Sequence, residues 1–433
     1  MSGSEVEIQA VIQKLIDEIA EDLDFDLDGP ISAQTRLVRD LGLASVDFIQ
    51  LIVGIEHHFG RKMKFHDLLM PDGAYVSDLT VGELVAFVAS KLNAQEPALE
   101  TGKPAAFPAS ASTVSGPVID PEMVAAFRGK TPSRACPAIS GAKHPRAVFV
   151  LTSPRSGSTL LRIILAGHPG LFAPPELHLL DYVDLGQRKA ALNNPLNEHL
   201  LTGSLRALMQ LTPCSQEEAA ATMGRYEEQK LSTYDFYFLL HRLLGDRLLV
   251  EKSPIYCLYP WVLQRAEHEF DQPRYIHLVR HPQGMIRSFE DAKIDALIPF
   301  MRESGYSRRQ LAELTWLVSH QNASTFLQTV PAERQILVRF EDVVRESERT
   351  GRRLCDFLDV PYVPEMLDPY LEKERRMTDG LKVASQYSGD LKFHLHGRIE
   401  PTAADRWKQY TSEGALSQMT YRLAESLGYS FSV

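Results

Sequence analysis

Four short apolar runs in the second part of the sequence restrict the fold more than any other feature. They span Ala147–Thr152, Arg247–Glu251, Arg274–Val279 and Gln335–Arg339. Each run is separated from the next by enough residues for a crossover helix. Strand-like runs that alternate with longer helical segments are typical of an α/β domain with a central parallel sheet. We therefore predict this fold class for the chain after Pro145.

A change in composition separates this region from a small N-terminal module. The intervening stretch is rich in Pro, Ala, Ser and Gly, which predicts a semi-rigid linker, with a short helix at Pro121–Arg128 inside it. In the module before it, apolar residues recur at helical spacing. The runs concerned are Ile8–Ile19, Ser45–Phe59 and Val81–Leu92. The predicted segments are a helical module over 1–93, the linker over 94–144 and the α/β domain over 145–433.

The negative charge of the chain is concentrated in the N-terminal module. The formal charge is −10, and residues 1–95 contain 16 Asp and Glu against 7 Lys and Arg. This asymmetry indicates a separate acidic module. Nonspecific affinity for nucleic acid depends on basic residues that neutralise phosphates. We therefore expect no nucleic-acid partner.

Neither a secretion signal nor a membrane span is evident in the sequence. The N-terminus lacks a basic stretch followed by an apolar run, and no later segment reaches the apolar length of a transmembrane helix. The four cysteines, Cys136, Cys214, Cys257 and Cys355, show neither metal-binding nor disulfide spacing. We expect a cytoplasmic protein with reduced thiols and no bound metal.

The N-terminal module contains a serine at a distinctive position. The segment Asp40-Leu41-Gly42-Leu43-Ala44-Ser45 puts Ser45 at the start of a helix, directly after a Gly-containing loop. It resembles the attachment loop of acyl and peptidyl carrier proteins, although Ala44 replaces the acidic residue usual there. The resemblance implies a small all-α four-helix bundle with 4′-phosphopantetheine on Ser45. It also implies a phosphopantetheinyl transferase and acyl-loading or polyketide synthase enzymes as partners. The alternative is that Ser45 is only a helix N-cap.

The first apolar run of the second domain leads into a loop suited to phosphate. After Val148–Leu151 come Thr152-Ser153-Pro154-Arg155-Ser156-Gly157-Ser158-Thr159 and then a helix at Leu160–Ala166. A strand, a Gly-containing turn and a helix N-terminus direct several backbone N–H groups at one place, where the helix dipole favours an anion. Arg155 adds positive charge, and the neighbouring hydroxyl groups add donors. The predicted ligand is a phosphorylated nucleotide.

This loop departs from the loop that binds a magnesium nucleoside triphosphate. That motif, G-x-x-x-x-G-K-[ST], requires Lys after its second Gly. Here Ser158 follows Gly157, and Thr152 stands at the first Gly. The loop instead resembles that of sulfotransferases that use 3′-phosphoadenosine 5′-phosphosulfate (PAPS), in particular tyrosylprotein and polyketide-pathway sulfotransferases. The resemblance covers about residues 145–430 and implies a P-loop-like α/β domain. It assigns the 5′-phosphosulfate to Arg155, Ser156, Gly157, Ser158 and Thr159.

Two further segments supply an anchor for the 3′-phosphate in this resemblance. The strand-like run Tyr275–Val279 ends at Arg280, and Ser288 follows. The match assigns Arg280 and Ser288 to the 3′-phosphate of PAPS, which leaves as adenosine 3′,5′-bisphosphate. Near the C-terminus, Phe393–Pro401 resembles the loop that closes over the nucleotide, and there Arg398 is expected to help to hold the same phosphate.

Three residues are candidates for the chemical step. Glu176 falls where tyrosylprotein sulfotransferases carry their catalytic glutamate, so the resemblance implies that it is the general base. His178 is a competing base, because many cytosolic sulfotransferases use histidine and its ordinary pKa suits neutral pH. The segment Glu251–Tyr256 resembles one in glycosaminoglycan sulfotransferases, which implies that Lys252 stabilises the bridging oxygen of the leaving nucleotide.

Together these features predict a PAPS-dependent sulfotransferase fused to a carrier domain. The expected acceptor is a hydroxyl group on an acyl chain tethered at Ser45 or on a sibling carrier, in polyketide or lipid-type biosynthesis. The alternative gives the sulfotransferase a free phenol or alcohol as its small-molecule substrate. In that case the N-terminal module is a docking or scaffold module.

Overall fold

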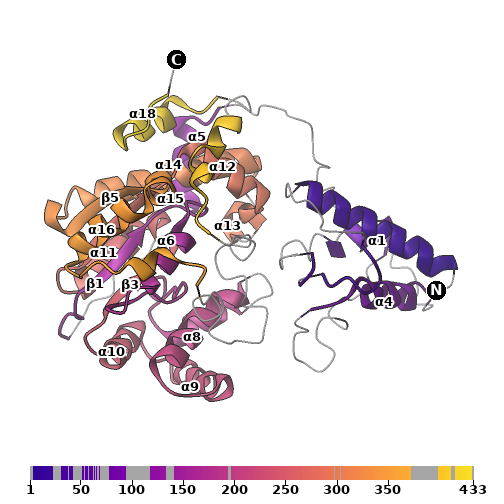
Figure 1. Cartoon of the computed structure of the whole chain (residues 1–433), viewed down its shortest axis with the longest axis horizontal. Coiled ribbons are helices and arrows are strands. Elements are labelled where there is room, and N and C mark those ends of the chain that lie inside the picture. The colour runs from indigo at the N-terminus through magenta and orange to yellow at the C-terminus, as the bar shows by residue number, and fades with distance from the viewer. Residues whose placement is uncertain are drawn as a thin grey trace. The chain divides into compact units, whose positions relative to one another are not determined.

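The fold is described by a computed structural model that divides into two compact units (Figure 1). The described residues are 3–22, 31–37, 39–41, parts of 51–68, 78–93, 118–132, 141–193, 197–296, 298–302, 304–371, 398–410 and 415–431. The first unit holds the described residues up to 93, and the second unit holds those from 118 onward.

The first unit is helical, as the apolar spacing predicts. Its helices α1 (Gly3–Asp22) and α4 (Val81–Asn93) enclose a small core. Ile8, Ile12 and Ile16 lie four residues apart on one face of α1 and are at most 3% exposed. A stripe at this spacing has to pack against a neighbour, and α4 contacts α1. Ser45 lies outside the described residues.

The second unit is built around a five-stranded parallel sheet with the order β2-β3-β1-β4-β5. The strands are β1 (Ala147–Leu151), β2 (Leu171–Phe172), β3 (Leu248–Glu251), β4 (Arg274–Val279) and β5 (Gln335–Arg339). The predicted α/β class with a parallel sheet is confirmed. The sequence pattern missed β2, because a strand of 2 residues shows no periodicity.

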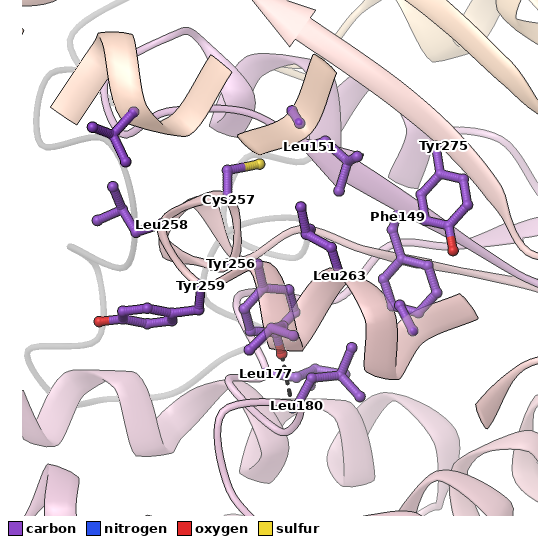
Figure 2. Close-up of a cluster of buried hydrophobic side chains, with 14 of the residues drawn as sticks. Phe149, Leu151, Leu177, Leu180, Tyr256, Cys257, Leu258, Tyr259, Leu263 and Tyr275 are labelled. Atoms are coloured by element: carbon purple, nitrogen blue, oxygen red, sulfur yellow. Dashed lines mark hydrogen bonds between the residues drawn. The ribbon is translucent and has the colours of Figure 1, made fainter. Parts of the chain in front are cut away.

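Both faces of the sheet are covered, which is usual for parallel sheets. Phe149 and Leu151 belong to one core, whereas Val148 and Val150 belong to the core on the opposite face. This division follows from the two-residue period of a strand. Figure 2 shows Phe149 and Leu151 in the first core, with Tyr275 of the neighbouring strand β4.

Helices connect and cover the strands. They are α5 (Pro121–Lys130), α6 (Ser158–Ala166), α7 (Leu185–Leu192), α8 (Thr202–Leu211), α9 (Gln216–Glu228), α10 (Thr233–Leu244), α11 (Pro260–Glu269), α12 (Pro282–Asp291), α13 (Pro299–Arg302), α14 (Arg308–Leu327), α15 (Phe340–Arg345), α16 (Ser347–Leu358) and α18 (Gln418–Ser426). Between β2 and β3 the chain forms α7 to α10, of which α8 and α9 pack side by side (Figure 1). The long helix α14 is largely buried.

Helix α5 belongs to the packed body of the second unit. Asp120 caps it by accepting a hydrogen bond from the backbone N–H of Met123 at 2.8 Å. Phe127 is fully buried, and Arg128 Nη2 donates to Gln321 Oε1 on α14 at 2.8 Å. The composition assigned this segment to the linker. The structure shows that α5 instead packs against α14, with Phe127 in the core of the second unit.

Candidate functional site

The order of the strands arranges the predicted site residues along one edge of the sheet. Parallel strands share an edge at their carboxyl ends, where α/β proteins bind ligands. Glu176 and His178 follow β2, Lys252 follows β3, the loop 152–157 follows β1, and Arg280 follows β4. The strands lie in the order β2-β3-β1-β4. The groups at their carboxyl ends therefore lie in the same spatial order: first the candidate bases, then the lysine, the phosphate loop and the arginine.

The backbone of the phosphate loop takes a shape that requires glycine. Gly157 has a φ of 81°, which lies in the left-handed region that glycine adopts readily. Arg155, with a φ of 62°, is one of the few other residues of the described structure in that region. A Cβ atom on Gly157 would lie 2.2 Å from Cδ2 of Phe340, so any other residue there would displace the Phe340 ring. Gly157 also has no side chain to cap α6, which leaves the first N–H groups of that helix for a ligand. The predicted hydroxyl donors, Ser156, Ser158 and Thr159, are at most 5% exposed.

The two predicted phosphate anchors contact each other. Arg155 Nε donates to Ser288 Oγ at 3.2 Å, and Arg280 Nη1 donates to the carbonyl oxygen of Arg155 at 2.9 Å. The Arg280 guanidinium also lies over the ring of Phe340, 4.7 Å from its centroid. Arg155, Arg280 and Ser288 therefore form one cluster at the loop, with two positive charges and a hydroxyl group.

Arg398 is placed differently from these residues. Its side chain is 83% exposed, and its Nε atom forms an ion pair with Glu400 Oε1 at 3.0 Å. The preceding residues 372–397, which include most of the predicted closing loop, lie outside the described residues. The structure thus brings Arg155, Arg280 and Ser288 together but shows Arg398 paired elsewhere.

Glu176 lies in a buried chain of alternating charges. Lys252 Nζ donates to Glu176 Oε1, and Glu176 Oε2 lies 3.2 Å from His178 Nε2. His178 Nδ1 in turn lies 3.1 Å from Asp181 Oδ2. The four side chains are between 2% and 13% exposed, so their charges need partners. The structure joins all three predicted catalytic residues and adds Asp181.

The charges in this cluster distinguish the two candidate bases. Burial alone would lower the pKa of His178, but its hydrogen bonds to Asp181 and Glu176 prevail and raise that pKa to about 9. Burial alone would raise the pKa of Glu176, but the Lys252 ammonium and His178 hold that pKa well below its usual range. At neutral pH His178 therefore carries a proton, and Glu176 is the group that is able to accept one.

The segment Glu251–Tyr256 holds the turn that carries these residues. The Tyr256 hydroxyl accepts a hydrogen bond from the backbone N–H of Leu180 at 3.1 Å, drawn as the dashed line in Figure 2, and donates to Glu251. Ser253 Oγ accepts a hydrogen bond from the backbone N–H of His178 at 3.3 Å. Burial raises the pKa of the Glu251 carboxyl group to about 7. Each polar side chain of the segment thus contacts the site or supports it.

Sequence reasoning missed three polar residues at the site. Asp181 follows His178 by three positions. This spacing alone does not predict a hydrogen bond between the two side chains, because the contact depends on the shape of the turn. Ser153 lies inside the predicted loop, where its hydroxyl bonds to that of Ser156 at 2.8 Å. His320 is on α14, far along the chain, and no motif surrounds it.

The described residues contain neither a candidate membrane span nor a candidate metal site. Among them, no helix is both long and apolar enough to cross a membrane. No group of three or more described His, Cys, Asp or Glu side chains is placed to hold a metal ion.

Comparison with known proteins gives two family matches and several relatives. Residues 145–364 match the sulfotransferase family, and residues 13–88 match the phosphopantetheine attachment site. The sulfotransferase domain from the curacin biosynthetic pathway is 38% identical with a TM-score of 0.62, and the match covers 67% of this chain and 100% of that domain. The sulfotransferase domain from the Synechococcus PCC 7002 olefin synthase is 37% identical with a TM-score of 0.62, and the match covers 69% of this chain and 100% of that domain.

A curated protein matches over a shorter region. Nodulation protein NoeE of Sinorhizobium fredii (strain NBRC 101917 / NGR234) is 28% identical over 159 residues, which is 37% of this chain. The match covers 34% of NoeE, so the chain spans about a third of the length of that relative.

Proposed function

Because the chain belongs to the sulfotransferase family and also has a carrier domain, we propose that it transfers a sulfuryl group from PAPS to a hydroxyl group of a carrier-tethered acyl chain. The observation that supports this most is the arrangement at one edge of the sheet. There the phosphate loop lies between a strand that ends at Arg280 and a strand that leads to Lys252. The two similar sulfotransferase domains come from the curacin pathway and from an olefin synthase, which supports a place in biosynthesis.

We assign the two ends of PAPS to the two anchors. The N–H groups at the start of α6, the loop hydroxyls and Arg155 receive the 5′-phosphosulfate. Arg280 and Ser288 receive the 3′-phosphate. PAPS supplies the activated sulfuryl group and leaves as adenosine 3′,5′-bisphosphate. The assignment of Arg398 to the 3′-phosphate stays a prediction, since its side chain is exposed in the structure.

The acidic and basic residues next to the loop suit the transfer step. The acceptor oxygen bonds to sulfur while the bond from sulfur to the 5′-phosphate oxygen breaks, and the hydroxyl proton passes to Glu176. Lys252 stabilises the charge that develops on the bridging oxygen. The Lys252 ammonium lowers the pKa of Glu176 when the two are paired. Sharing that ammonium with the leaving group therefore makes Glu176 a stronger base during transfer.

The carrier domain supplies the tethered acceptor in this proposal. The phosphopantetheine family match spans residues 13–88 and therefore includes Ser45, which we assign as the attachment residue. A phosphopantetheinyl transferase adds the arm, and polyketide synthase-type or other acyl-loading enzymes act on the loaded carrier. The acidic charge of residues 1–95 suits basic partner enzymes.

Intact-protein mass spectrometry tests the proposal in two steps. The protein is first incubated with a phosphopantetheinyl transferase and a β-hydroxyacyl coenzyme A, and then with PAPS. We expect one acyl-phosphopantetheine on the wild type, none on Ser45→Ala, and one added sulfonate on the loaded wild type after PAPS. Absence of loading would refute the carrier role of Ser45. Sulfonation of a free phenol or alcohol without sulfonation of the loaded chain would support the alternative acceptor.

A further inference from the structure

A line of buried polar side chains runs from the phosphate loop into the protein. Ser156 Oγ lies 2.8 Å from Ser153 Oγ, and Ser153 Oγ lies 3.3 Å from His320 Nε2. His320 Nδ1 lies 3.0 Å from His277 Nε2. All four residues are at most 4% exposed. The loop that we assign to the phosphosulfate is thus connected to a pair of buried histidines.

The same helix holds both anion anchors. On α14, Trp316 Nε1 donates to the carbonyl oxygen of Arg280 at 2.9 Å. His320 lies four residues later, so it is on the same face of the helix and reaches Ser153. One buried helix therefore fixes the arginine anchor through Trp316 and the loop through His320.

Both histidines are uncharged at neutral pH. Burial lowers the pKa of His277 to about 4. Burial, together with the neighbouring His277, lowers the pKa of His320 well below its usual range. A neutral imidazole has one N–H donor and one acceptor nitrogen. Each histidine can therefore pass a hydrogen bond along the line in only one direction at a time.

The direction of the line decides what Ser156 is able to do. In one direction His277 donates to His320, His320 donates to Ser153, and Ser153 donates to Ser156, so the Ser156 O–H remains available to donate to an anion. In the opposite direction the Ser156 O–H donates to Ser153 Oγ and is not available to an anion. An anion in the loop favours the first arrangement, since hydrogen bonds to charged groups are the stronger ones.

We propose that His320 is a positioning residue that, together with His277, orients the Ser153 and Ser156 hydroxyls so that Ser156 donates to the 5′-phosphosulfate. This inference rests on the proposed function, because it needs an anion in the loop. His320 does not contact the reacting atoms in this arrangement. It acts through Ser153 and Ser156.

The test measures binding of adenosine 3′,5′-bisphosphate to the full-length protein by titration calorimetry. In His320→Asn the amide takes the place of Nδ1, so the variant keeps a partner for His277 and loses the donor to Ser153. In His320→Gln the amide takes the place of Nε2 and keeps that donor. We expect about 10-fold weaker binding for His320→Asn and a return to within about 3-fold of wild type for His320→Gln.

A double-mutant cycle separates this role from a general effect on the core. Ser153→Ala is expected to weaken binding about 10-fold, and Ser153→Ala combined with His320→Asn is expected to be no weaker than either single variant. Additive losses would overturn the inference. Ser319→Ala is the matched control, because within the described structure the neighbouring Ser319 hydroxyl is also buried but has no hydrogen-bond partner. It is expected to bind like wild type.

Each remaining outcome has a defined meaning. If wild type does not bind the bisphosphate, the proposed function fails. If wild type binds and folded His320→Asn binds equally well, the proposed function stands and the inference is wrong. If His320→Asn does not fold, Ser153→Ala decides, and wild-type affinity in that variant would overturn the inference.

Discussion

His178 Nε2 lies 3.2 Å from Glu176 Oε2, and His178 Nδ1 lies 3.1 Å from Asp181 Oδ2. Two carboxylates on either side of one imidazole favour its protonated form. This geometry favours a protonated His178 beside an ionised Glu176. The sequence left both residues open as bases, and their burial with Asp181 and Lys252 supports our assignment of Glu176 as the base.

Glu176→Gln tests the base at the residue scale. We expect turnover to fall about 100-fold or more, because a neutral amide cannot accept the hydroxyl proton. Affinity for adenosine 3′,5′-bisphosphate should stay within about 3-fold, measured by calorimetry, since the loop and Arg280 keep their contacts. Glu122→Gln, at an exposed position on α5, is the control and should match wild type.

Unchanged turnover in Glu176→Gln would move the base role to His178. The substitution leaves the buried Lys252 ammonium without its carboxylate partner, so thermal unfolding is recorded alongside. Turnover is then compared at a temperature at which both proteins are folded.

The proton on His178 should make the stability of the protein depend on pH. The pKa of His178 is raised from 6.5 to about 9, so the folded state binds this proton more tightly than the unfolded state. The resulting stabilisation is fully present below pH 6.5 and is lost as the pH rises through about 9. We expect the unfolding free energies of wild type and His178→Gln to converge over that window. These free energies are measured by denaturant unfolding. A difference between the two proteins that grows with rising pH would contradict the protonated state of His178.

At the scale of elements, helix α8 supports the turn that carries Glu176. Gly203 is the second residue of α8, and a Cβ atom there would lie 2.0 Å from the carbonyl oxygen of Glu176. Backbone atoms cannot yield as a flexible side chain can. The close contact therefore makes α8 a support on which the Glu176 turn rests.

Gly203→Ala tests this support. The added methyl group should displace the turn and lower turnover by about 10-fold or more, because small misplacements of a catalytic group are costly. Gly224→Ala is the matched control on α9, where nothing lies within 4 Å of the added Cβ. It should leave turnover unchanged and stabilise the helix by up to about 1 kcal/mol. Equal turnover in the two variants, measured with the same loaded acceptor, would show that α8 does not position Glu176.

At the scale of the whole molecule, the carrier and the sulfotransferase are joined by one chain. Because both domains belong to one chain, their meeting is an intramolecular event, and tethered modules of this kind reach an effective concentration of about the millimolar range. Such a value exceeds the concentration of a sibling carrier in a dilute assay. We therefore favour sulfation of the acyl chain on the same molecule.

Single-turnover kinetics test this preference. With the loaded protein and excess PAPS, the rate constant for sulfonate gain should not change over about a 30-fold range of protein concentration. Addition of unloaded Ser45→Ala protein, which keeps the sulfotransferase domain, should not accelerate it. A rate that rises in proportion to either protein would instead indicate a sibling carrier as the acceptor.

Features that depend on neighbours along the chain could be predicted from the sequence alone. Four strands, helices α1 and α4, and the Gly157 loop follow from local apolar period and from a backbone shape that few residues adopt. The site candidates Arg280 and Lys252 could be predicted because each stands directly after a strand, and parallel strands bring such positions to one edge. The family matches agree with this level of prediction.

The tertiary structure decided what depends on residues far apart in sequence. It placed α5 against α14, formed the short strand β2 beside β3, and brought His320 to the loop. It also separated the pKa values of Glu176 and His178, because a pKa depends on burial and on partners such as Lys252, which is 76 residues from Glu176 in the sequence. Packing sets these distances, and no local pattern encodes them.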